Sequence, residues 1–155
     1  MLILIAFTVF AIIFLVLFNF KRTHDDILRR VFFIREKYDK EILLEKTDVS
    51  CESSTLGLKN GKYYFIRCDL IFLKNAFVII PFKEIGRYKL YSNLILIENG
   101  VVIGHGAIKR FNPNSINDEV YLEFGNSSLK STLVTIRLKL LTTKERSLIP
   151  VNKIG

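Results

Sequence analysis

Histidine and cysteine are the side chains in this sequence best suited to catalysis or metal binding, and each type occurs twice. His105 lies between two glycines in "GHGA", where the backbone is able to approach a substrate closely, although a solvated histidine on a hairpin is the simpler interpretation. His24, Cys51 and Cys68 form neither a Cys-x-x-Cys motif nor a zinc-ligand spacing. A reducing compartment keeps both cysteines as free thiols. Cys51, in a polar segment, is expected to be the more reactive of the two.

The other patterns that commonly carry chemistry are missing from the sequence. There is no G-x-S-x-G elbow to present a nucleophile, and no glycine-rich loop to hold a phosphate group. The acidic residues are scattered, so a paired-carboxylate or hard-metal site has no support. The sequence therefore predicts a non-catalytic protein without a cofactor or a metal. An enzyme of unrecognised type stays as a minor alternative.

The first 20 residues are the most apolar part of the chain. From Leu2 to Phe18 only Thr8 is polar, and charged side chains begin at Lys21. A helix over residues 2–20 is about 28 Å long, close to the about 30 Å of a bilayer's hydrocarbon core. A cleaved signal peptide is the alternative, but there is no positive n-region and no small-residue cleavage site. A buried helix of a soluble domain is the second alternative. Such a helix is usually amphipathic, whereas this stretch is apolar all round. Residues 1–20 are predicted to be an uncleaved signal anchor.

Basic residues near the membrane predict the orientation of this anchor. Lys21 and Arg22 flank it directly and further basic residues follow, whereas only the amino group of the chain precedes it. The positive-inside rule then places the N-terminus outside the cell membrane and residues 21–155 in the cytoplasm. The chain is thus predicted to be a single-pass membrane protein.

The formal net charge of +8 indicates which partners are suitable. A basic domain held at an anionic leaflet gains about 1 kcal/mol for each Lys or Arg near the surface. Nucleic acid is the other acidic partner in principle, but the anchor makes it an unexpected one. A basic surface that is merely solvated is the third interpretation.

Residues 21–46 are predicted to form an amphipathic juxtamembrane helix over about 24–45. Its apolar residues recur at helical spacing, and Thr23 and Asp26 have the spacing of a capping box at its start. Packing against the following domain is the expected role of the helix, with the bilayer surface or a second helix as alternatives. Arg35 interrupts the apolar face, which argues against a long coiled coil.

Residues 47–155 are predicted to be a β-rich domain. The segment 47–62 is polar and is interpreted as a linker or loop with a short strand at 54–58. After it the apolar period becomes two, which is typical of strands. Asn99-Gly100 has the sequence of a two-residue hairpin turn. About seven short strands without a long helix between them predict an antiparallel barrel or sandwich, followed by a short C-terminal helix near Thr142. The strand candidates are 62–69, 70–74, 76–82, 93–98, 101–108, 119–124 and 131–141.

The stretch "GKYYFIRCDLIFLKNAFVIIPFKEI" (61–85) resembles the pleckstrin-homology-like domains, in particular their GRAM and bacterial branch. The family's closing segment corresponds here to Ile80, Pro81, Phe82 and Ile85. The resemblance implies a partly open, seven-stranded barrel that is closed by a C-terminal helix and serves as a binding module. In this chain the C-terminal segment "TTKERSLI" is shorter than the usual closing helix, and tryptophan is missing.

Two functions from different classes follow. The first is a membrane-anchored binding module that contacts anionic lipid or a membrane protein. For it we predict an anionic-surface site at Lys59 and Lys62, which flank the Asn60-Gly61 turn, together with Lys74 next to the following turn. The resemblance implies that such early loops form the ligand-facing end. The second function is a structural or assembly subunit of a membrane or envelope complex.

Overall fold

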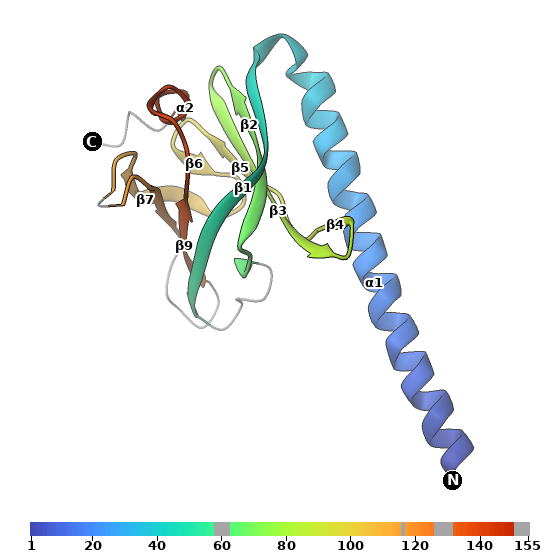
Figure 1. Cartoon of the computed structure of the whole chain (residues 1–155). Helices are drawn as coiled ribbons and strands as arrows, with labels where there is room; N and C mark the ends of the chain where they lie inside the picture. Colours follow the sequence, from blue (N-terminus) through green and yellow to red (C-terminus); the bar gives the residue numbers. More distant parts are fainter. Residues whose placement is uncertain (58–62, 116, 126–131, 151–155) are drawn as a thin grey trace.

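A computed structural model of the chain describes residues 1–57, 63–115, 117–125 and 132–150, with the side chains of residues 2–4 and of Gly57 left aside. A long N-terminal helix lies beside a β-barrel, and a short helix covers one end of the barrel (Figure 1). The elements are α1 (Leu2–Lys37), the 3-10 helix η1 (Asp39–Glu41), β1 (Ile42–Gly57), β2 (Arg67–Leu73), β3 (Ala76–Ile85), β4 (Tyr88–Tyr91), β5 (Ile95–Glu98), β6 (Val101–Val102), β7 (Gly106–Asn112), β8 (Val120–Phe124), β9 (Thr132–Leu138) and α2 (Thr143–Ser147).

In the described part of the chain, eight antiparallel strands close into a ring in the order β2-β1-β9-β8-β7-β6-β5-β3, with β3 pairing back to β2. β4 pairs with β3 alone and forms a hairpin outside the ring. The predicted mainly β fold with accessory helices is therefore confirmed, and it is a barrel rather than a sandwich. The ring holds one strand more than the predicted seven, and it is closed rather than partly open.

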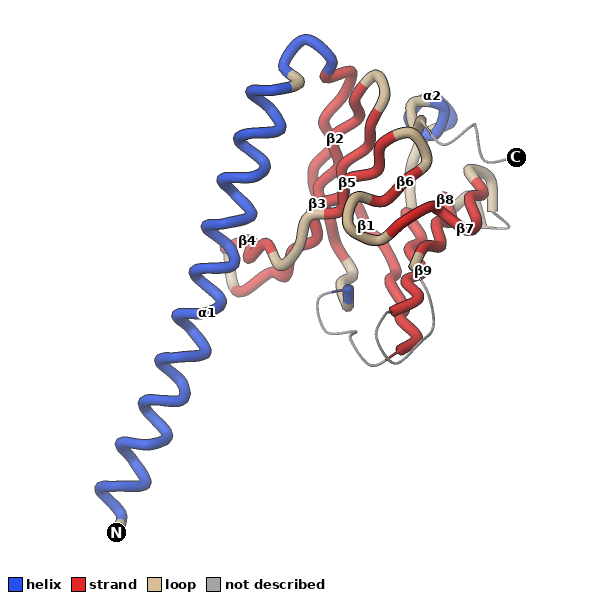
Figure 2. Tube along the Cα trace, turned by 180° about the vertical axis from the view of Figure 1, so that it is seen from behind, coloured by secondary structure: helices blue, strands red, loops and turns tan. Residues whose placement is uncertain are grey.

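The barrel has two ends that differ in what surrounds them. At the end that we call the base, β1 ends, β2 begins and β9 begins. The base points to the same side as the N-terminal half of α1 (Figure 1). The opposite end, the cap end, carries α2 and the turn between β2 and β3, as the view from behind also shows (Figure 2). α2 begins at the predicted capping box, in which Thr142 Oγ1 accepts from Glu145 N–H and Thr142 N–H donates to Glu145 Oε2 at 2.7 Å.

Two separate apolar clusters hold the molecule together. The inward-facing residues of the ring form the first cluster, which includes Phe72, Phe77 and Phe124. Leu148 and Ile149, directly after α2, pack against this cluster. The second cluster lies outside the ring, where one face of α1 packs on β2, β3 and β5. β2 and β3 are buried on both faces because the barrel interior lies on one side of them and α1 on the other. This double burial explains why their sequences are continuous apolar runs.

α1 is one continuous helix from Leu2 to Lys37, so the predicted anchor and the predicted juxtamembrane helix are not separate elements. The expected capping box at Thr23 is wrong, because the helix runs through this point and Thr23 Oγ1 donates to Asn19 O, one turn earlier. The expected end near residue 45 is wrong as well. After Lys37 the chain turns through η1, and Ile42 already pairs with Leu73 in the sheet.

β1 overturns the prediction of a linker before residue 54, whereas the short strand expected at 54–58 is confirmed as far as Gly57, as the last part of this strand. It is a 16-residue strand that pairs first with β2 and then with β9, with irregular register between Lys46 and Val49. It also crosses the predicted domain boundary between residues 46 and 47. Its inward-facing residues include Val49, Cys51 and Ser53, whereas polar residues between them face solvent.

The strands of the second half follow the predicted pattern more closely. The expected alternation of β8 and β9 is confirmed, with Val134, Ile136 and Leu138 facing the core. Leu140 lies in the predicted strand 131–141, where the alternation would place it on the core side. It is instead 81% exposed at a φ of 58°, and Leu141 is buried in its place. The predicted strand 101–108 is divided into β6 and β7 by a turn at 103–105.

The hairpin turn at Asn99-Gly100 joins β5 to β6 as predicted, and both residues have positive φ, 50° and 77°. A type I′ turn requires this geometry, which a β-branched residue adopts only under strain. We therefore expect Gly100→Val to lower the free energy of unfolding by about 1–2 kcal/mol. Denaturant titration of the full chain in detergent measures this change. Val101→Thr, a substitution next to the turn, is the control and should stay within about 0.5 kcal/mol of the wild type.

Candidate functional site

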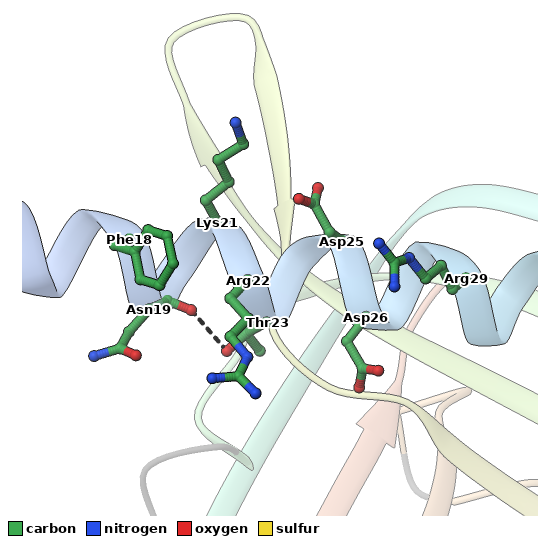
Figure 3. Close-up of a pocket in the computed structure, with 8 residues that line it drawn as sticks. All are labelled: Phe18, Asn19, Lys21, Arg22, Thr23, Asp25, Asp26 and Arg29. Atoms are coloured by element: carbon green, nitrogen blue, oxygen red, sulfur yellow. Dashed lines mark hydrogen bonds between the residues drawn. The ribbon is translucent and has the colours of Figure 1, made fainter.

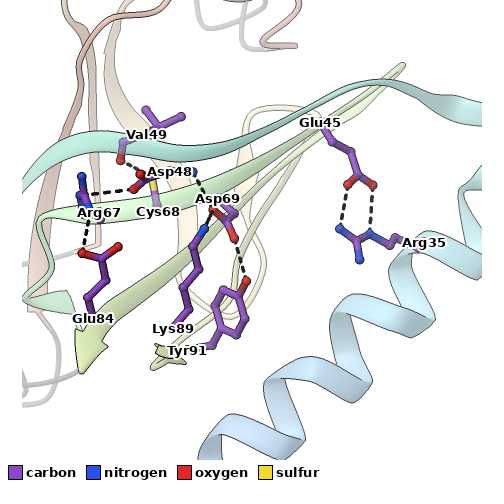
Figure 4. Close-up of polar contacts among 10 residues, drawn as sticks. All are labelled: Arg35, Glu45, Asp48, Val49, Arg67, Cys68, Asp69, Glu84, Lys89 and Tyr91. Carbon is purple, nitrogen blue, oxygen red and sulfur yellow. Dashed lines mark hydrogen bonds and ion pairs between the residues drawn. The ribbon is translucent and has the colours of Figure 1, made fainter. Parts of the chain in front are cut away.

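Asp69 of β2 lies at the centre of a polar cluster on the outer surface of the barrel (Figure 4). One carboxylate oxygen accepts from the backbone N–H of Asp48 and from Lys89 Nζ, each at 2.8 Å. The other oxygen accepts from the hydroxyl of Tyr91 at 2.7 Å. The carboxylate is nearly buried and both of its oxygens are used, so Asp69 ties β4 and β1 to β2 instead of being poised for catalysis.

Three further ion pairs lie near this carboxylate (Figure 4). Arg35 of α1 forms a bidentate pair with Glu45 of β1, at 3.0 and 2.7 Å, so the residue that interrupts the apolar face of the helix has a defined role. Arg67 bridges Asp48 and Glu84. These pairs are largely exposed, and such pairs stabilise a protein by at most about 1 kcal/mol each. Their contribution is to fix how the helix, β1 and the β3–β4 hairpin sit relative to one another.

His24 holds the β3–β4 hairpin on α1. Its Nδ1 accepts from the backbone N–H of Tyr91 at 3.1 Å, and its ring stacks on the ring of Tyr91 with centroids 5.6 Å apart. His24 lies about one helical turn after Phe20, where the predicted anchor ends. The hairpin is thus attached to α1 immediately next to the apolar half of the helix.

Burial and the hydrogen bond to Asp69 raise the pKa of Tyr91 to about 12, from the ordinary value of about 10. Because the folded state binds this proton more tightly, the stabilisation is complete below pH 10 or so and is lost as the pH rises through about 12. We expect the free energy of unfolding of the full chain to fall over this range, as followed by denaturant titration. Tyr91→Phe should show a smaller fall, and an equal fall would contradict the assignment.

At the base of the barrel, Tyr63 and His105 form the other polar contact of note. The hydroxyl of Tyr63 meets Nε2 of His105, and the Tyr63 ring packs edge-on against Phe124 with centroids 6.2 Å apart. Burial raises the pKa of the Tyr63 hydroxyl. His105 itself is exposed on the turn between β6 and β7. This pair closes the base around the first apolar cluster. Among the described residues, no group of three or more His, Cys, Asp or Glu side chains is placed to hold a metal ion.

Both cysteines are free thiols in the barrel interior, so the expectation that Cys51 is accessible is wrong. Its segment is an inward-facing part of β1. Hydrogen bonding with Cys51 and burial raise the pKa of the Cys68 thiol, which lowers its reactivity further. We expect both thiols to react with a maleimide far more slowly in the folded chain than in denaturant, as followed by mass spectrometry. Rapid modification of Cys51 in the folded chain would contradict its position.

A groove of about 410 Å³ lies between the C-terminal half of α1 and the β5–β6 region. Its floor is apolar, and Phe33 is 62% exposed on its helical side. Arg29, Arg30 and Lys37 lie along its helical side, and none of the described residues that line it is acidic. Apolar surface with basic groups around it suits an amphipathic segment that carries acidic residues. The remaining lining residues are Ile34, Tyr38, Leu94, Leu96 and Ile103.

Lys21 and Arg22, the predicted membrane-flanking residues, lie on exposed faces of α1 directly after its apolar half (Figure 3). They line a shallow recess formed by residues of α1 alone, together with Asp25, Asp26 and Arg29. Asp26 pairs with Arg30 at 3.0 Å. The junction therefore carries mixed charge on one helix. It offers a surface for headgroups, not an enclosed ligand site.

Of the predicted anionic-surface residues, Lys59 and Lys62 fall outside the described residues, and their role stays a prediction. Lys74 is exposed at the cap end, where its N–H donates to Glu41 O at 3.0 Å. Gly57, the last described residue before Lys59, lies at the other end of β1, and a strand of 16 residues spans about 50 Å. Lys74 is therefore not at the end of the barrel that carries Gly57 and Tyr63.

Comparison of the chain with protein-family models, with curated proteins and with solved structures finds no match. The candidate sites accordingly rest on the geometry of this chain. The residues that the sequence did not identify are those of the Asp69 cluster and of the groove. Asp69 and Lys89 are 20 positions apart, and no local spacing indicates that they meet.

Proposed function

We propose that this chain is a single-pass, membrane-anchored, non-catalytic binding module that presents its barrel at an anionic bilayer surface. One observation carries the proposal: α1 joins an apolar half, whose described side chains from Ile5 onward are not buried by the rest of the chain, to a half that packs on the barrel. The N-terminal helix is long and apolar enough to cross a membrane. A barrel joined to such a span without a flexible segment is held at a fixed place above the lipid.

The distribution of charge supports a cytoplasmic barrel with the N-terminus outside. Lys21, Arg22, Arg29 and Arg30 follow the span within ten residues, well inside the about 15–20 residues over which the positive-inside rule acts. Lys21 and Arg22 come first and lie at the height of the headgroups, where each basic residue contributes about 1 kcal/mol of attraction to an anionic leaflet. The pleckstrin-homology-like resemblance implies a seven-stranded, partly open barrel with a C-terminal helix. This chain shares the barrel and the C-terminal helix, though its ring is closed and has eight strands in the described part, and the shared features support a binding module.

The experiment that tests this function uses the full chain in cells. A reporter fused after Gly155 that is active only outside the cytoplasm should be silent, and a reporter active only in the cytoplasm should work. The membrane fraction should retain the chain after alkaline carbonate extraction, and the mature protein should still contain residues 1–20. Release by carbonate, or a mature N-terminus beyond Phe20, would contradict the anchor, and the opposite reporter pattern would contradict the orientation.

The groove favours a second candidate function, that of an assembly subunit. Arg29 lies nine residues after Phe20 and Lys37 seventeen, which is about 13 and 25 Å along the helix. The polar layer on each side of a bilayer is only about 5–8 Å thick. The groove therefore lies above the headgroups, where a protein is a more suitable occupant than a lipid. Its chemistry fits an amphipathic, acidic segment of a neighbouring membrane protein.

Phe33→Glu tests this second function because it places a carboxylate in the apolar groove. In mild detergent the wild-type chain should migrate in a complex larger than its own 18.0 kDa, and the variant should migrate alone. Phe32→Glu is the matched control, since Phe32 is exposed on the same helix and does not line the groove. If the wild-type chain migrates alone, the assembly function is contradicted, and anionic lipid remains the proposed partner.

A further inference from the structure

The tip of the β3–β4 hairpin is an exposed apolar and basic loop that the barrel does not need for its own core. β3 and β4 pair from Phe82↔Tyr91 to Ile85↔Tyr88, so Gly86 and Arg87 form the turn. Gly86 has a φ of +63°, as the first central position of a type II′ turn requires. Tyr88 is 80% exposed and Ile85 63%. Neither side chain belongs to either apolar cluster.

The position of this hairpin is fixed relative to α1. Tyr91, at its foot, is bound to His24 on one side and to Asp69 on the other. In Figure 3 the hairpin is the ribbon that passes the helix near Lys21 and Asp25, and Figures 1 and 2 place β4 against the middle of α1. His24 is four residues after Phe20, about 6 Å along the helix, which is within the polar layer of a bilayer.

The residue types at the tip are those that favour the boundary between lipid and water. A tyrosine places its ring in the headgroup region and its hydroxyl in water, and basic side chains extend toward phosphate groups from an apolar stem. Lys83 and Arg87 lie beside the exposed Ile85 and Tyr88. Within the described part of the chain, neither Lys83 nor Arg87 takes part in an ion pair. Glu84, the acidic residue of the hairpin, is already paired with Arg67.

We propose that the hairpin tip, Ile85–Tyr88 with Lys83, is a second membrane contact that enters the headgroup layer beside α1 and takes anionic phospholipid as its ligand. This inference rests on the proposed function, because only a span in α1 places the hairpin at this height. Span and hairpin together give two points of contact with the bilayer. Two points prevent the barrel from rotating about the helix, so one side of the barrel always faces away from the lipid.

The chain contains no tryptophan, so a single introduced tryptophan reports its own surroundings without background. We would insert the full chain carrying Tyr88→Trp into vesicles of phosphatidylcholine and phosphatidylglycerol in equal amounts. We expect its emission to move to shorter wavelength and to be quenched several-fold more by spin-labelled headgroups than that of the control. The control is Leu43→Trp, a half-exposed position at the start of β1, beyond the C-terminal end of α1.

A charge variant tests the anionic ligand. Lys83→Glu with Arg87→Glu, in the Tyr88→Trp background, should reduce the headgroup quenching in these vesicles. The reduction should be smaller in phosphatidylcholine alone, because the variant then loses no attraction to anionic lipid. Equal quenching of Tyr88→Trp and Leu43→Trp would overturn the hairpin contact. Quenching that the charge variant leaves unchanged would overturn the anionic ligand.

The hairpin proposal and the proposed function fail in different ways. A chain that resists carbonate extraction while Tyr88→Trp stays unquenched keeps its anchor and lacks the second contact. A chain that carbonate releases has no anchor, and the proposed function then fails first. Circular dichroism of each variant in vesicles shows that the fold is retained, and a variant that loses its fold is replaced by Arg87→Trp at the same turn.

Discussion

Replacing Val31 by aspartate will detach α1 from the barrel while the barrel stays folded. Val31 is only 6% exposed at the centre of the second apolar cluster, between Ile27 and Ile34. A carboxylate buried there without a partner costs about 3 kcal/mol or more. Because the barrel interior is a separate cluster, the cheaper response is for the helix to leave the sheet. In the variant, the placement of α1 relative to the barrel should therefore be lost before the β structure is lost.

Spin labels at Leu28→Cys and Leu140→Cys measure this detachment, because both positions are exposed and lie on different elements. The distance distribution between them should be narrow in the wild-type background and broad in Val31→Asp, with the β signal in circular dichroism unchanged. Phe32→Asp is the matched control, since Phe32 is exposed on the opposite side of α1 and should leave the distribution narrow. A narrow distribution in Val31→Asp would show that the docked interface is not what fixes the barrel.

Asp69→Ala should have the second largest effect among the changes considered. The substitution removes the acceptor of Lys89 Nζ, of the Tyr91 hydroxyl and of the Asp48 N–H at once. Donors left without a partner in a nearly buried position cost about 1–3 kcal/mol each, and breaking a buried ion pair costs about 3–5 kcal/mol. We expect the free energy of unfolding to fall by about 3 kcal/mol. This is the lower end of the range, because Lys89 is able to turn toward solvent once its partner is removed.

Asp69→Asn separates the contribution of charge from that of shape. Its amide oxygen still accepts one hydrogen bond, so the loss should be about half that of Asp69→Ala. Denaturant titration of both variants in the full chain gives the two values, and hydrogen exchange at β4 shows whether the hairpin is released. An Asp69→Ala variant within about 0.5 kcal/mol of the wild type would show that the cluster is not a structural clamp.

The elements that the sequence predicted well are those whose local pattern and final surroundings agree. β8 and β9 alternate because one of their faces lies on the core and the other on solvent. Asn99-Gly100 forms its hairpin because the turn needs positive φ at both positions. The Thr142 capping box forms because it needs only its own four residues. In each case the physical cause acts over a few neighbouring positions.

The sequence did not predict the full length of β1, or β4 at all, because the residues that stabilise these strands are distant in the sequence. The first half of β1 follows apolar residues at helical spacing, and its inward positions include small residues such as Cys51 and Ser53. Pairing with β2 and β9 on either side is what makes this segment a strand. β4 has four residues and is held by Asp69 and His24, which lie about 20 and 65 positions earlier in the chain. No local signal reports such partners.

The candidate sites also differ in whether a local sequence pattern or the folded structure brings their residues together. The charge pattern predicted Lys21 and Arg22 as membrane-flanking residues because adjacency to an apolar run is a local property. The groove and the β3–β4 hairpin tip consist of residues that meet only after the barrel closes and α1 docks. Phe33 and Leu96, for example, are 63 positions apart in the sequence. In the sequence, their apolar residues are indistinguishable from core residues. Only the fold shows that these side chains are exposed.

The central claim is that one rigid helix crosses the bilayer and also carries the barrel. The most direct test is a scan of single nitroxide labels along α1 from Phe14 to Lys37, in the full chain in vesicles. We predict an unbroken helical period, access to lipid-dissolved oxygen up to Phe20, and access to a water-soluble nickel chelate at the exposed positions from Lys21 onward. Labels at the buried Ile27 and Ile34 should be immobile and shielded from the chelate. A break in the period between Phe20 and His24, or mobile and water-accessible labels at Ile27 and Ile34, would contradict it.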